Sequence, residues 1–147
     1  MVIEQALDKW IFLVENVPNV LIQINEDEMA KKVAFNKWSK KEILGHLIDS
    51  ATNNHQRFVR GQFETVPEIS YDQNNWNTFS YYQQIDSQQI ITFWTIYNRQ
   101  LIEIIKRIPS DNLKKMIRVG AKTVTIENLV IDYIEHLEHH LNQLVNS

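Results

Sequence analysis

The stretch IENLVIDYIEHLEHHLNQLVNS, residues 126–147, has an apolar residue at every third or fourth position. This spacing matches the 3.6-residue period of an α-helix, so it predicts a long amphipathic helix with one buried face. Thr125 stands directly before it and is suited to cap the helix. The apolar positions of this face are Ile126, Leu129, Val130, Tyr133, Leu137, Leu141 and Leu144.

The same stretch holds three of the five histidines of the chain. His136 and His140 fall along the apolar face, whereas His139 falls on the opposite, solvent side. Side chains four residues apart on a helix lie about 5–6 Å apart at Cβ, so both inward imidazoles can reach one metal ion. They could instead be core residues that each make one hydrogen bond. Metal binding is the favoured interpretation because one ion gives both buried imidazoles a partner.

Three further segments show helical periodicity with recognisable boundaries. Ser39 and Glu42 have the spacing of a reciprocal capping box, and Ser87 resembles a cap. The predicted helices run from Ile3 to near Pro18, from Ser39 to about Gly61, and from Ser87 to Pro109. Together with the last helix they predict an all-α four-helix bundle, with up-down-up-down order at its simplest, in a single domain of residues 1–147.

The connections between these helices are less regular. Residues 63–84 have no sustained period and are expected to form an ordered loop, and residues 25–32 could form a short helical turn. The pieces MIRV and KTVT, around Gly120, are rich in β-forming residues and could pair briefly, although they are too short to build a sheet.

Composition excludes several classes of protein. The 147 residues contain no cysteine, which excludes disulfides, thiolate metal sites and cysteine nucleophiles. The net charge of −3, with acids and bases interspersed, gives no basic surface for nucleic acid. No signal peptide or stretch of membrane-spanning length is visible, so we expect a soluble, cytoplasmic protein that binds neither nucleic acid nor membrane.

A third metal ligand should come from another helix, because two imidazoles seldom hold a divalent ion alone. His46 is favoured over His55, since it lies at the edge of the buried face, whereas His55 suits a surface position or a hydrogen bond to the loop. Asp49, one turn after His46, could act as a base or orient an imidazole, or it could be an acid on the helix exterior. Asp132 has the same two interpretations. The Glu-x-x-His pairs of di-iron bundles and the His-Glu-x-x-His motif of zincins do not occur.

The central loop offers a candidate substrate wall or lid. Tyr71, Asp72, Asn75 and Trp76 combine polar groups with aromatic faces, which suits contacts to a small molecule, although the same residues could simply cover the bundle.

Two segments, KWSKKEILGHLIDS (residues 37–50) and TVTIENLVIDYIEHLEHHLNQL (residues 123–144), resemble the DinB-like superfamily, and YDQNNW in the central loop adds to the match. The resemblance covers most of the chain. It implies a four-helix bundle, often dimeric, that binds a divalent metal, commonly nickel or zinc, through one histidine of the second helix and two of the last. Carried over, these ligands are His46, His136 and His140. One departure is Leu141, where relatives commonly carry a basic residue.

The resemblance also implies a range of activities. Better-understood members of the family include S-transferases that use bacillithiol or mycothiol and a thiol-dependent isomerase, and others are called metal-dependent hydrolases. Three neutral imidazoles leave the charge of the ion uncompensated, so it can activate a thiol or water without a protein cysteine. We therefore expect a metal-dependent enzyme that transfers a low-molecular-weight thiol to an electrophile. The alternatives are a hydrolase that activates water and a non-enzymatic, stress-related binding module.

Overall fold

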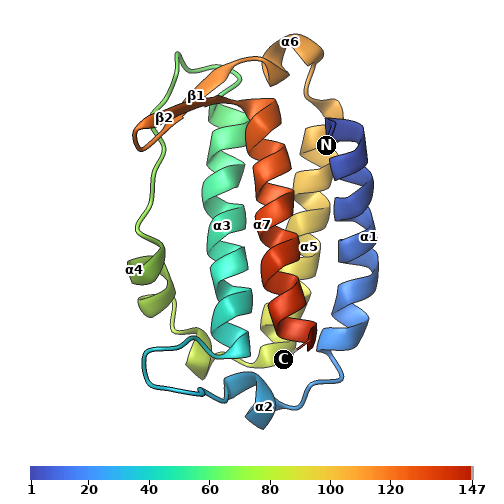
Figure 1. Ribbon diagram of the computed structural model, residues 1–147, viewed down its shortest axis with the longest axis vertical. Helices are drawn as coiled ribbons and strands as arrows, with labels where there is room; N and C mark the ends of the chain where they lie inside the picture. Colours follow the sequence, from blue (N-terminus) through green and yellow to red (C-terminus); the bar gives the residue numbers. More distant parts are fainter. Residues whose placement is uncertain (147) are drawn as a thin grey trace.

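The computed structural model describes residues 1–146 and confirms an all-α four-helix bundle (Figure 1). Helices α1 and α3 each pack against both α5 and α7, so the four form a closed ring around one hydrophobic core. The long helices are α1 (Ile3–Leu21), α3 (Lys40–Arg60), α5 (Ser87–Arg107) and α7 (Ile126–Asn146).

The order of helix directions differs from the simplest expectation. Figure 1 shows α3 and α5 running in the same direction, with α1 and α7 running the opposite way, so the up-down-up-down order is wrong. The reason is residues 61–86, which return along the outside of the bundle and include α4 (Gln73–Thr78) and the 3₁₀ turn η1 (Tyr82–Gln84). A helix of α3's length is about 30 Å long. A connection as long as residues 61–86 can span that distance even though part of it is helical.

Two predicted helix starts are confirmed by their capping bonds. The Ser39 hydroxyl accepts from the backbone N–H of Glu42 at 3.2 Å, while the Glu42 carboxylate accepts from the backbone N–H of Ser39 at 2.9 Å. The Thr125 hydroxyl accepts from the backbone N–H of Asn128 at 3.0 Å. These bonds fix where α3 and α7 begin, and with them the rotation of their histidines toward the core.

The end of α1 and the start of α5 differ from the prediction. Helix α1 continues past Pro18 to Leu21, and the Pro18 carbonyl still accepts from the backbone N–H of Ile22 at 3.0 Å. Ser87 is the first residue of α5 rather than its cap, and Asp86 holds the cap position without a side-chain bond. The carboxylate of Glu26 accepts from the backbone N–H of Ser87 at 3.3 Å and so supplies the missing partner from α2.

The smaller elements lie at the two ends of the bundle. The predicted β-pairing is confirmed as a two-stranded antiparallel hairpin, which turns at Gly120 with a φ of +61°. The elements at the ends of the bundle are α2 (Glu26–Ala30), α6 (Ser110–Leu113), β1 (Met116–Val119) and β2 (Lys122–Thr125).

No helix within residues 1–146 is long and apolar enough to cross a membrane.

One polar residue sits at the centre of the core. Asn98 on α5 is fully buried, and its side-chain oxygen accepts from the indole N–H of Trp10 at 3.1 Å and from the hydroxyl of Tyr133 at 2.6 Å. Its amide nitrogen donates to the carbonyl of Trp94 at 2.9 Å. This network joins α1, α5 and α7 and so fixes how they pack against one another.

Candidate metal centre

Three histidines from two neighbouring helices meet with their Nε2 atoms facing one another. His46 on α3 lies 3.2 Å from His136 on α7, and His140, one turn further on α7, lies 3.1 Å from His136, measured between Nε2 atoms. One ring nitrogen from each of the three can be chosen so that all lie within 4.8 Å of one another. The three residues predicted as ligands are therefore brought together by the packing of α3 against α7.

The spacing of these nitrogens suits a metal ion. A tetrahedral zinc ion with Zn–N bonds of about 2.0–2.1 Å places neighbouring nitrogens about 3.3 Å apart. The imidazole of His140 donates from Nδ1 to the side-chain oxygen of Gln143 at 2.8 Å, which leaves a lone pair on its Nε2 when the ring is neutral. Hydrogen bonds among the three Nε2 atoms cannot satisfy all of them, whereas one ion can accept a lone pair from each.

Burial keeps two of these imidazoles neutral. The pKa of His46 and of His136 is lowered to about 4 each, mainly by burial and in smaller part by neighbouring imidazoles, which for His136 include the exposed His139. Both rings are therefore deprotonated at neutral pH, as metal ligands must be.

Asp49, the predicted base, lies one turn after His46 on the buried side of α3. Its carboxylate accepts from the hydroxyl of Tyr82 at 2.6 Å, and its second oxygen has no hydrogen-bond partner among the described residues. Burial raises the pKa of Asp49 to about 6, and the bond from Tyr82 partly opposes this rise. Tyr82 had no signal of its own in the sequence, but Gly45 within a helix was a signal that another group approaches closely there.

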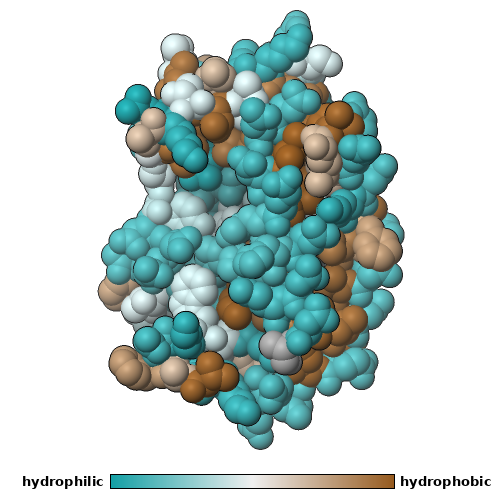
Figure 2. Space-filling model, viewed as in Figure 1, coloured by the Kyte–Doolittle hydropathy of each residue, from teal (hydrophilic) through white to brown (hydrophobic). Residues whose placement is uncertain are grey.

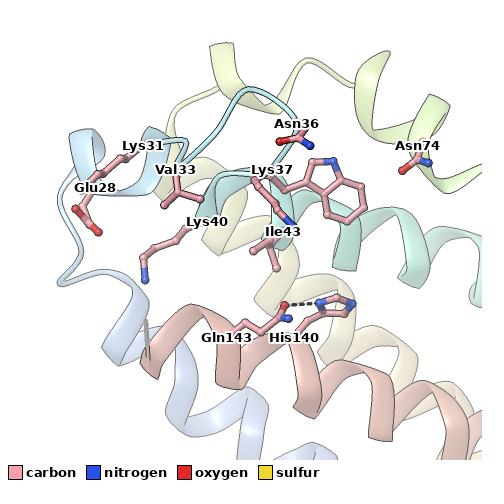
Figure 3. Close-up of a pocket in the computed structure, with 11 residues that line it drawn as sticks. Glu28, Lys31, Val33, Asn36, Lys37, Lys40, Ile43, Asn74, His140 and Gln143 are labelled. Carbon is pink, nitrogen blue, oxygen red and sulfur yellow. Dashed lines mark hydrogen bonds between the residues drawn. The ribbon is translucent and has the colours of Figure 1, made fainter.

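Two cavities reach the histidine cluster from different sides. The larger, about 780 Å³, lies between the α2–α3 connection and α7 and includes His140 (Figure 3). Figure 3 shows His140 and Gln143 facing Lys37 and Ile43 across this space. The smaller, about 190 Å³, lies between α3, α7 and Tyr71 and includes His136. Two small molecules could thus approach one metal from two directions.

The central-loop residues predicted to form a substrate wall differ in their position relative to the two cavities. Tyr71 borders the smaller cavity. Asp72 caps α4, accepting from the backbone N–H of Asn75 at 3.0 Å, and Trp76 packs edge-on against Tyr71 with ring centroids 6.0 Å apart. Asp49, Asp72 and Trp76 border neither of the two cavities that include a cluster histidine.

The remaining histidines do not join the cluster. His55 bonds through Nδ1 to the hydroxyl of Tyr97 on α5 at 2.9 Å, so its partner is a helix residue and not the loop. His139 is exposed on the outer side of α7. Asp132 is exposed at the edge of the smaller cavity.

Comparison with known protein families matches residues 4–144 to the DinB superfamily. The chain belongs to this superfamily. Members of the DinB superfamily similar to it include the Bacillus subtilis protein named "Putative metal-dependent hydrolase YfiT", 23% identical over 94% of this chain and 82% of its own length. The solved structure of YfiT covers 95% of this chain and 84% of its own, with 22% identity and a TM-score of 0.81.

A second solved structure has the same DinB-like fold. The mycothiol-dependent maleylpyruvate isomerase matches with a TM-score of 0.80 and 11% identity, covering 98% of this chain and 61% of its own. These likenesses show the fold, and YfiT is likewise described as a four-helix bundle of unusual topology.

Proposed function

We propose that the protein is a metal-dependent enzyme in which His46, His136 and His140 hold one divalent ion, nickel or zinc. The observation that supports this most is the convergence of three buried or half-buried imidazoles with Nε2 separations of 3.1 and 3.2 Å. Imidazole nitrogens suit both metals. The names of curated relatives, which describe metal-dependent hydrolases, support metal dependence as well.

The reaction we propose is the transfer of a small thiol to an electrophile. A bound ion of this kind supplies Lewis acidity that lowers the pKa of a thiol or of water. The chain has no cysteine, so the thiol must be a separate molecule. In the transfer a sulfur–carbon bond forms, the leaving group departs with the electron pair of its bond to carbon, and the thiol proton goes to solvent.

The two cavities support a reaction with two substrates. The larger one, at about 780 Å³, has room for a low-molecular-weight thiol beside His140. The smaller one, at about 190 Å³, has room for a compact electrophile beside His136. A hydrolase needs only one organic substrate and water, and would leave one of these cavities without a use.

Water activation by the same three ligands is the second candidate. It is favoured by the names of the relatives, several of which are described as metal-dependent hydrolases. The two reactions are separated by measuring turnover of an electrophilic test substrate with and without an added thiol. Turnover that requires the thiol supports the transferase, and turnover that ignores it supports the hydrolase.

The metal itself is tested first, by elemental analysis of untagged protein. We expect near-stoichiometric nickel or zinc in the wild type and its loss in His136→Ala and in His140→Ala. His139→Ala is the matched control, because His139 is exposed on the same helix and should leave metal content unchanged. A wild type that neither contains nor takes up a divalent ion would make the histidines core residues and favour the non-enzymatic binding module.

A further inference from the structure

Arg57 on α3 is a buried cation that lacks an acidic partner. Its side chain is only 7% exposed, yet within residues 1–146 no carboxylate lies at ion-pair distance from it. Its Nε donates to the carbonyl of Ile69 at 3.0 Å, and one terminal nitrogen donates to the side-chain oxygen of Asn54 at 3.2 Å. Both acceptors are neutral.

Burying a guanidinium without an ion-pair partner is costly, because water no longer solvates it. The carboxylate of Glu68 acts on Arg57 only from beyond ion-pair distance, and Glu68 pairs with Arg118 instead. The second terminal nitrogen of Arg57 has no hydrogen-bond acceptor within residues 1–146, and it is not among the fully buried polar atoms that lack a partner there. It therefore retains contact with open space. A charge held in this way is available to a ligand.

The open space beside Arg57 is the smaller cavity that also includes His136. Asn54 and Tyr71 form part of its wall, and the guanidinium carbon of Arg57 lies 5.9 Å from the centre of the Tyr71 ring. At about 190 Å³ the cavity has the volume of about six water molecules, which suits a very small organic acid. Figure 2 shows the surface recessed between the α4 segment and α7.

We propose that Arg57 is a carboxylate-binding residue for the electrophilic substrate, holding its acid group while its reacting carbon faces the histidine cluster. This inference rests on the proposed function for the identity of the substrate, and on the cavity and the unpaired guanidinium for the subsite. The guanidinium fork matches a carboxylate in two parallel hydrogen bonds. Tyr71 and Asn54 restrict the orientation of the fork, so an acid group would be held in one geometry.

Asp132 sets the charge that the subsite accepts. It is exposed at the edge of the same cavity and forms no ion pair with Arg57. A ligand with two negative charges, such as phosphate, is repelled by this carboxylate more strongly than one with a single charge. The cavity is therefore suited to a monocarboxylate.

The first experiment uses metal-free protein and does not depend on the metal. The side-chain Nε–H signal of Arg57 is followed by NMR while propionate, propionamide or inorganic phosphate is added at constant ionic strength. We expect a saturable shift with propionate, none with propionamide, and weaker binding of phosphate. Asp132→Asn should strengthen propionate binding. Equal responses to propionate and propionamide would overturn the proposal.

The second experiment uses zinc-loaded protein, 2-mercaptoethanol and two matched electrophiles, iodoacetate and iodoacetamide. The chain has no cysteine for them to alkylate. We expect the protein to prefer iodoacetate, relative to the uncatalysed rates, by about tenfold or more, as charge-assisted hydrogen bonds to a carboxylate allow. Arg57→Gln should abolish this preference and Arg57→Lys should retain part of it. Arg60→Gln is the control, since Arg60 lies one turn away and pairs with Glu64.

The two experiments separate the two proposals. A propionate-specific shift at Arg57 without any acceleration of alkylation would refute thiol transfer and leave the carboxylate subsite standing. Acceleration that is equal for iodoacetate and iodoacetamide, together with no propionate-specific shift, would refute the subsite and leave thiol transfer standing. The wild-type NMR titration tests the carboxylate subsite even if Arg57→Gln does not fold.

Discussion

Gly45→Ala should destabilise the protein although alanine is the better helix former. Gly45 lies in α3 directly before His46, and a Cβ atom built there overlaps three atoms of the Tyr82 ring. That ring is only 8% exposed, and its hydroxyl holds the buried carboxylate of Asp49 at 2.6 Å. A methyl group at position 45 therefore displaces the η1 segment, which carries Tyr82 and packs against α3.

The expected size follows from three contributions to the free energy of unfolding. Replacing glycine within a helix by alanine stabilises by about 1 kcal/mol. Overpacking the core costs about 1–3 kcal/mol, and weakening a hydrogen bond to a buried charged group costs about 1.5–3 kcal/mol. The sum is a net loss of about 1.5–5 kcal/mol for Gly45→Ala.

Urea unfolding of the metal-free protein measures this loss. The matched background is Tyr82→Ala, in which the ring is absent and the new methyl group has space. Gly45→Ala should there become neutral or stabilising by about 1 kcal/mol, so the sign of its effect reverses. A stabilising effect of Gly45→Ala in the wild type would refute the packing of Tyr82 against α3.

Three further outcomes are expected of the metal-free protein in urea unfolding. Asn98→Ala should cost about 2–5 kcal/mol, because it leaves the buried N–H of Trp10 and hydroxyl of Tyr133 without an acceptor; an effect under 1 kcal/mol would contradict the network. Thr125→Ala should cost about 1 kcal/mol through loss of the α7 cap, whereas Thr125→Ser should cost less. Because the folded-state pKa of His46 is lowered to about 4, its contribution to stability is present above pH 6.5 and lost as pH falls from 6.5 toward 4. His46→Gln should reduce that slope, and an unchanged slope would contradict the assignment.

The fold could be read from the sequence as far as its signals are local. Helix periods and the capping groups Ser39 and Thr125 act within a few residues, so the four helices and two of their starts were predictable. The direction of α5 relative to α3 was not, because it depends on the path of residues 61–86, which have no sustained period. That path is held by long-range contacts, such as the bond between Tyr82 and Asp49.

The candidate site was likewise predictable only where its signals are local. The four-residue spacing of His136 and His140 and the position of His46 at the edge of an apolar face were enough to choose the three residues that meet in the structure. Arg57 was not recognisable, since an arginine beside a polar stretch normally indicates a surface. Its burial results from the loop at Ile69, whose carbonyl it binds, and no local pattern encodes that contact.

Charge around the metal centre favours anionic ligands, although the whole chain carries a net charge of −3. Lys31, Lys37 and Lys40 line the larger cavity and Arg57 the smaller, against one acid in each, Glu28 and Asp132. Lys31 and Lys37 are exposed and Lys40 is half-buried, so salt screens these charges over about 8 Å at physiological ionic strength, whereas the buried guanidinium is screened much less. Raising the salt concentration should therefore increase the KM for an anionic thiol and change the KM for a carboxylate electrophile little. Equal salt dependence of the two KM values would mean that both substrates enter through the same exposed cavity.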